Sequence, residues 1–162
     1  MASRTASAKL SGDSTPTRTS YDGDVVAWAD EQARLIRAGR FDELDLEHIA
    51  DEIEDVGRSE RRELVSRLSV LLMHLIKWQW QPSYRSRSWE LTISDQRRMI
   101  ARALERMPSL RPTLNDPGWI EDAWSDAVAM ATRVTGIDRV MLPPTCPWTM
   151  SDVVSGGWKP GP

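Results

Sequence analysis

The sequence contains few of the residues that crosslinking, metal binding and catalysis use. It has one cysteine, Cys146, so no disulfide can form within the chain, and two histidines, His48 and His74. It has no Gly-x-Ser-x-Gly, no His-Glu-x-x-His, no phosphate-binding loop and no paired cysteines. These absences favour a protein that is not an enzyme, and they predict neither a cofactor nor a resident metal.

Long apolar runs are also missing. The stretch richest in apolar residues, 68–76, is interrupted by Ser69 and His74 and is much shorter than the roughly 20 residues of a membrane-spanning helix. The first residues lack the apolar stretch of a signal peptide. The net charge is −3 and the pI about 5.4, which removes any global attraction to nucleic acid or anionic lipid. We therefore expect a cytoplasmic protein that binds no membrane and is a poor candidate for nucleic-acid binding.

Aromatic usage is unbalanced, with eight Trp, two Tyr and one Phe among 162 residues. Forty per cent of the residues are hydrophobic and 28% are charged, as in ordinary folded domains. Because large aromatic side chains are mostly buried for their area, tryptophan is expected to fill core positions that Phe and Leu occupy elsewhere.

No segment alternates strictly between apolar and polar residues, so the chain is predicted to be all-α. A first helix is expected at about 24–38, capped by Asp22 or Asp24 and stopped by Gly39. A long helix should run from an Asp45 cap to the stop at Pro82. Its two apolar stripes are in phase, which favours one helix, continuous or gently kinked at Gly57, although Ser59 could cap a separate second helix.

The remainder predicts two more helices and an irregular end. Ser88 can cap a helix from Trp89 to Pro108, a short helical turn follows, and a fourth helix should close at Gly136. The Pro- and Trp-rich end is predicted to pack on the helices as a strap, through the apolar residues Val140, Leu142, Trp148, Val153, Val154 and Trp158. We expect a disordered tail at 1–20 and a single domain at 21–160, folded as a compact antiparallel helical bundle.

Several blocks of the sequence are similar to a known family. "YDGDVVAWADEQARLIRAGRFDELDLEHIADEIEDVGRSERREL", "LLMHLIKWQWQP" and "SRSWELTISDQRR" occur in the order typical of a widespread bacterial family catalogued as domain of unknown function number 29. The resemblance implies a compact all-helical fold without an established activity. The chain departs mildly from the family pattern at Asp51, where Glu is typical, and at Ile76, where Leu is usual. It draws attention to the blocks that contain Glu52, Glu54, His74, Lys77, Gln81, Pro82, Arg87, Ser88, Trp89 and Arg97.

Residues 42–55 form an acidic segment, with eight acids and no Lys or Arg. Its first acids lie near a helix N-terminus, where the helix dipole favours negative charge. His48 and Glu52 are four residues apart on one helical face, which is half a metal site, and His74 could add a ligand. Ion pairs, such as Glu54 with Arg58, are the more ordinary interpretation of such a run.

The densest candidate site is the stretch "HLIKWQWQPSYRSRSW", residues 74–89. Seven arginines against three acids lie between Pro82 and Pro112, and a helix N-terminus near arginines can hold an anion. The same arginines could instead dock onto the acidic segment. The candidate binding residues are His74, Lys77, Gln81, Arg85, Arg87, Trp89 and Arg97.

These observations support three hypotheses. The first is a non-enzymatic interaction module that binds an unknown protein partner or another copy of itself. The second is a metal- or small-anion-binding protein that uses the His74/Glu52 or the Arg87/Trp89/Arg97 region, and such a protein could be an enzyme. The third is a nucleic-acid accessory protein, for which binding should weaken steeply with salt.

Overall fold

The computed structural model describes residues 19–161, and these residues contain helices and no strand. The predicted all-α bundle with a long central helix is confirmed. Except for Thr19 and Ser20, the predicted disordered tail lies outside the described residues. The chain divides into an N-terminal unit, described here from residue 19 to 53, and a C-terminal unit from residue 54 onward. That residues 21–160 form a single domain remains a prediction.

The N-terminal unit is a helical hairpin. Helix α1 (Val25–Arg37) starts at Asp24, whose side chain accepts hydrogen bonds from the Val26 and Ala27 N–H groups, and the chain turns at Gly39 with φ of +71°. A short 3-10 helix, η1 (Phe41–Glu43), leads into the first turns of α2. The buried side chains of α1 are Trp28, Gln32 and Leu35. They are spaced four and three residues apart and so share one face.

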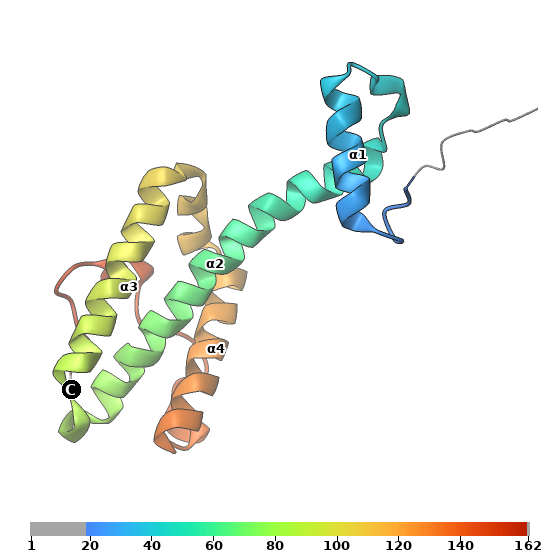
Figure 1. Ribbon diagram of the computed structural model, residues 1–162. Helices are drawn as coiled ribbons and strands as arrows, with labels where there is room; N and C mark the ends of the chain where they lie inside the picture. Colours follow the sequence, from blue (N-terminus) through green and yellow to red (C-terminus); the bar gives the residue numbers. More distant parts are fainter. Residues whose placement is uncertain (1–18, 162) are drawn as a thin grey trace, which may run out of the picture. The chain divides into compact units, whose positions relative to one another are not determined.

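Helix α2 runs without interruption from Leu46 to Trp80 (Figure 1). Asp45 lies just before it, as predicted, and accepts a hydrogen bond from the His48 N–H group. Gly57 lies inside the helix, so the alternative start at Ser59 is not used. The chain leaves the helix at Pro82, which begins the 3-10 helix η2 (Pro82–Tyr84).

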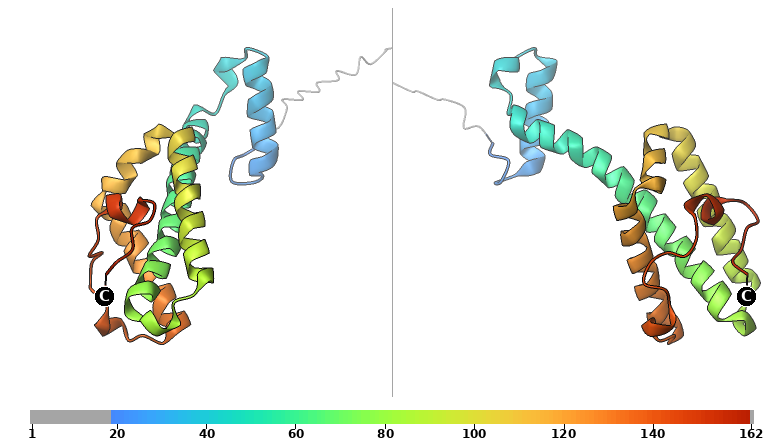
Figure 2. Two further views of the ribbon diagram at one scale, coloured as in Figure 1. Left: turned by 90° about the vertical axis from the view of Figure 1, so that its left-hand side faces the viewer. Right: turned by 180° about the vertical axis from the view of Figure 1, so that it is seen from behind.

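In the C-terminal unit, the second half of α2 lies between α3 (Arg87–Arg106) and α4 (Pro117–Thr135), as the front and rear views show (Figures 1 and 2). The chain direction of α3 is opposite to that of α2 and of α4. The 3-10 helix η3 (Pro108–Asn115) joins α3 to α4, which has Asp116 as its N-cap and Gly136, with φ of +72°, as its C-cap. The core of this unit includes the fully buried side chains Leu64, Leu68, Leu71, Leu72, Leu75, Ile76, Ile93, Ile100, Trp124, Val128 and Val153.

The C-terminal strap, residues 137–161, is packed against the helices rather than free (Figure 2). It contains the 3-10 helix η4 (Arg139–Met141) and the short helix α5 (Met150–Val154). Leu142, Met150 and Val153 join the core cluster, and Trp124 donates its indole N–H to the Pro143 carbonyl. The strap was therefore predicted correctly as a packed element.

Two local predictions were wrong, the cap of α3 and the packing of Val140. α3 starts at Arg87 with Ser86 as its cap, because the Ser86 hydroxyl accepts from the Trp89 N–H three residues on. Val140, which was expected to pack, is 83% exposed, because it lies on a one-turn helix that contributes no buried residue. Leu91 is 55% exposed, although α3 is helical there and Ile93 is buried.

Candidate functional site

Cations lie over tryptophan rings where α2 passes into α3. The Lys77 Nζ atom is 4.3 Å from the Trp89 ring centre, and the Arg85 guanidinium is 4.8 Å from that of Trp78. Arg85 also donates to the Trp78 carbonyl at 2.9 Å, and so satisfies one of the free carbonyl groups at the α2 C-terminus. We call these four residues the Trp–cation corner. Each cation covers an aromatic face, so the corner is at least partly an internal packing arrangement.

The other predicted binding residues do not all join this corner. Arg87 is the exposed first residue of α3, and Gln81 is the half-buried residue before η2. His74 is half-buried and donates its Nδ1–H to the Val70 carbonyl at 3.0 Å, one turn back in its own helix. Burial lowers the pKa of His74, which favours the neutral imidazole. A binding role for these three residues stays a prediction.

Arg97 is bound to the strap rather than to the corner. Its side chain is only 7% exposed, its Nε donates to the Val153 carbonyl at 2.8 Å, and its Nη2 donates to the Trp158 carbonyl at 2.6 Å. α3 presents Arg97 on the same face as Ile93 and Ile100, at helical spacing, which explains why a cation reaches the interior. Burial lowers the pKa of the Arg97 guanidinium, but arginine stays charged.

Beside Arg97, α3 and the strap line an open pocket of about 490 Å³. Its polar lining residues include Arg98 and Lys159, neither of which was among the predicted site residues. Lys159 forms an ion pair with Glu90 at 2.7 Å and lies 4.0 Å over the Trp78 ring. Periodicity within α3 could not have found Lys159, because its place depends on how the irregular strap folds back.

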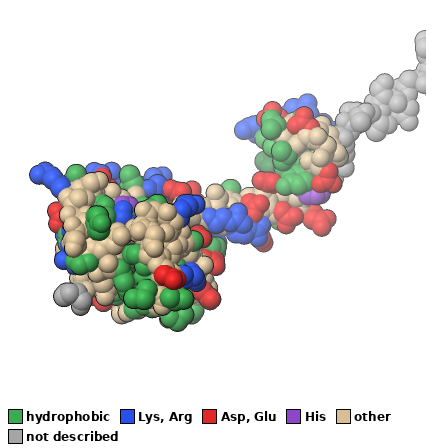
Figure 3. Space-filling view, turned by 90° about the horizontal axis from the view of Figure 1, so that it is seen from below, with side chains coloured by type: hydrophobic (Ala, Val, Ile, Leu, Met, Phe, Trp, Pro, Cys, Tyr) green, Lys and Arg blue, Asp and Glu red, His purple; other side chains and the backbone are tan. Residues whose placement is uncertain are grey.

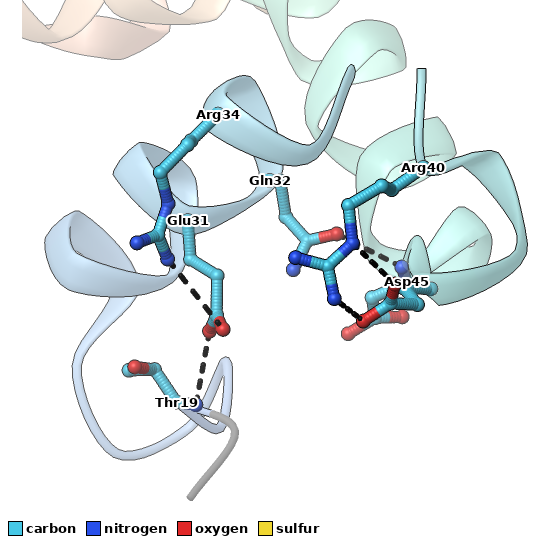
Figure 4. Close-up of polar contacts among 7 residues, drawn as sticks. Thr19, Glu31, Gln32, Arg34, Arg40 and Asp45 are labelled. Carbon is cyan, nitrogen blue, oxygen red and sulfur yellow. Dashed lines mark hydrogen bonds and ion pairs between the residues drawn. The ribbon is translucent and has the colours of Figure 1, made fainter. Parts of the chain in front are cut away.

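The N-terminal unit contains a second polar cluster, centred on Asp45. The Trp28 indole N–H donates to Asp45 Oδ2 at 3.1 Å, and His48 Nδ1 donates to the same oxygen at 2.7 Å. The Tyr21 ring stacks on His48 with ring centres 4.2 Å apart. In Figure 4, Gln32 reaches from α1 toward Asp45, where its side-chain oxygen accepts from the Asp45 backbone N–H.

These contacts shift two pKa values. The hydrogen bond to Asp45 raises the pKa of His48. Partial burial would by itself raise the pKa of Asp45, but hydrogen bonds from His48 and Trp28 outweigh it, and the net direction is downward. The pair therefore favours an imidazolium beside a carboxylate.

The acidic segment finds partners close to it along the chain. Arg40 pairs with Glu43, Arg58 pairs with Glu54 and Asp55, and the Tyr21 hydroxyl donates to Glu52. His48 thus faces Asp45, while Glu52 is bound by Tyr21, so the predicted half metal site is not formed by these two side chains. Among the described residues, no group of three or more His, Cys, Asp or Glu side chains could hold a metal ion.

Apolar side chains are exposed on the N-terminal unit. Leu46 and Ile53 are 66% and 68% exposed, and the half-buried Ile49 lies between them at spacings of three and four residues. We call these three residues the α2 stripe. Other exposed apolar side chains of this unit are Val25, Val26, Ile36 and Phe41. Figure 3 shows hydrophobic side chains gathered on one face of this unit, with acidic side chains beside them.

Comparison with known families gives one match. The family model "Domain of unknown function DUF29" matches residues 20–159. The chain belongs to the DUF29 family. No curated protein and no solved structure matches this DUF29 chain. Within residues 19–161, no helix is both long enough and apolar enough to cross a membrane.

Proposed function

We propose that this DUF29 protein is a non-enzymatic interaction module whose N-terminal unit binds a basic, amphipathic helix of a partner protein. The observation that carries the proposal is the α2 stripe. Leu46, Ile49 and Ile53 follow the spacing by which one helix packs on another, and two of the three are largely exposed. Large apolar side chains repeated along one helical face are typical of a protein-binding surface.

Charge supports a basic partner. Residues 19–53 contain ten acids and three Lys or Arg, a net charge of −7, whereas residues 54–162 have a net charge of +2. Glu47 and Asp51 lie on the same turns of α2 as the stripe but on other faces of the helix, and neither forms an ion pair with a residue in the described part of the chain. A helix with apolar residues on one face and Lys or Arg beside them would complement both properties.

Binding to a designed peptide tests this function. The probe is a Leu/Lys amphipathic helix, and the control peptide has the same composition in scrambled order. We expect the amphipathic peptide to bind the wild-type protein. The double variant Leu46→Gln/Ile53→Gln should raise the Kd for this peptide by about tenfold or more, because two large apolar contacts are lost. Val140→Gln, which alters an exposed valine of the strap, should leave the Kd unchanged.

Two results would contradict the proposal. Equal binding of the scrambled peptide would mean that charge alone attracts it. A wild-type dimer in analytical ultracentrifugation that Leu46→Gln/Ile53→Gln converts to a monomer would show that a second copy occupies the stripe.

Raising the salt concentration should weaken peptide binding, and Glu47→Gln/Asp51→Asn should reduce that salt dependence.

A further inference from the structure

Arg97 is a buried cation whose contacts supply no opposite charge. Both hydrogen-bonded partners, the Val153 and Trp158 carbonyl groups, are neutral. No carboxylate among residues 19–161 pairs with this guanidinium. Removing a cation from water without an anion is costly, so the position is unusual for a residue that serves packing alone.

The guanidinium also has an unused donor. Nε and Nη2 are occupied, and Nη1 has no hydrogen-bond partner among the described residues. Arg97 lines the pocket of about 490 Å³ between α3 and the strap. An arginine that is more than nine-tenths buried, lines a pocket and has an unpaired N–H group is a ready donor for an oxyanion.

The rest of the pocket fits the same ligand. Arg98 and Lys159 add two cations against one acid, Glu90. Gly156 and Gly157 form part of the wall, and a Cβ atom at either position would meet nothing within 4 Å, so the backbone there faces open space. Lys159 already neutralises Glu90, and Arg98 pairs with Asp95. Such exposed pairs are weak and can be shared with a ligand.

We infer that this pocket binds a small molecule through an oxyanion, a phosphate or carboxylate group. Arg97 is the buried donor, while Arg98 and Lys159 attract the anion at the rim. The site is contained in the C-terminal unit, so it does not depend on the function proposed for the α2 stripe.

Titration of the full chain with inorganic phosphate and with succinate, followed by amide NMR, tests the inference. Chloride at matched ionic strength is the reference. We expect saturable shifts at Ser94, Gly156 and Gly157 with phosphate, with succinate or with both, and the responding anion identifies the group. Arg98→Gln and Lys159→Gln should each raise the Kd by about 1.5- to 5-fold, which is the range for the loss of one exposed charge contact. Arg106→Gln removes an exposed charge from the last turn of α3, outside the pocket, and should leave the Kd unchanged.

Arg97→Gln should abolish binding, and Arg97→Lys should restore it only in part because the planar fork is lost. If loss of the strap contacts unfolds both variants, the two rim variants still decide the question. The inference is overturned if neither anion gives a saturable shift, or if chloride gives the same shifts. It is also overturned if Arg98→Gln/Lys159→Gln leaves the Kd unchanged.

Discussion

The two histidines of the chain have opposite environments. His48 is hydrogen-bonded to a carboxylate, which raises its pKa, whereas His74 is half-buried against a backbone carbonyl, and burial lowers its pKa. We expect one NMR titration of the ring protons to place His48 above, and His74 below, the ordinary value of about 6.5. Asp45→Asn should move His48 back toward that value and leave His74 unchanged. A downward shift of His48 in the wild type would show that the pair with Asp45 does not persist in solution.

The same shifts give the N-terminal unit a defined pH dependence. Because the folded His48 pKa is raised, its contribution to stability is complete below about pH 6.5 and is lost as pH rises through the folded value. Because the folded Asp45 pKa is lowered, its contribution is complete above about pH 3.9 and is lost as pH falls. The effect of His48→Gln on hydrogen-exchange protection of α1 should therefore be largest between these limits and shrink at higher pH. A pH-independent effect would contradict the assignment.

A buried leucine of α2 should contribute far more to the free energy of unfolding than an exposed leucine of α3. Leu75 is fully buried, so Leu75→Ala removes contacts and leaves a cavity, and it should lower the free energy of unfolding by about 2–5 kcal/mol. Leu91→Ala is the matched control, with an expected change within about 0.5 kcal/mol. Chemical denaturation of both variants measures the difference. Equal losses would mean that Leu91 is also buried in solution.

At the scale of single residues, the sequence predicted less than at the scale of helices. Arg97 was predicted to be a binding residue because it lies in a stretch that resembles the DUF29 family. Its hydrogen-bond acceptors, however, lie on the strap. A carbonyl acceptor leaves no signature in a sequence, since every residue has one. Lys159 was missed for the related reason that irregular segments have no period from which to infer a facing residue.

Among the elements, two glycines with different backbones provide a matched pair of substitutions. Gly57 lies inside α2, where a Cβ would meet only the flexible end of Arg61 at 3.4 Å. Gly57→Ala should therefore raise the free energy of unfolding by about 1 kcal/mol, the difference in helix propensity. Gly136 ends α4 at a positive φ, so Gly136→Ala should lower stability by about 1 kcal/mol. Thermal unfolding distinguishes the two signs. Destabilisation by Gly57→Ala would indicate a bend at that position in solution.

Helix boundaries were predicted well wherever a cap and a stop residue marked both ends. Asp24 and Gly39 bracket α1, and Asp45 and Pro82 bracket α2. The start of α3 was placed two residues late because both Ser86 and Ser88 can cap a helix. Periodicity identified the apolar faces but not what covers them. Leu68 and Ile53 have the same kind of pattern, yet one is buried and the other is exposed.

For the whole molecule, the two units have very unequal cores. α1 contributes three buried residues, whereas the C-terminal unit gathers most of the buried apolar side chains of the described chain. Local stability follows buried contacts. Hydrogen exchange by mass spectrometry should therefore show residues 25–37 exchanging well before residues 64–76. Similar protection of both segments would indicate that another surface covers the N-terminal unit in solution.

The uninterrupted course of α2 has a consequence for shortening this protein. The boundary between the two units falls at Ile53 and Glu54, inside a helix, so no linker is available for a protease or for a clean cut. A chain begun at residue 54 would expose roughly four N–H groups that the preceding turn now satisfies. In a chain begun a few residues later, Ser59, unused as a cap in the full chain, could accept from one of the free N–H groups of the new first turn. The sequence thus carries a second place at which the C-terminal unit could begin.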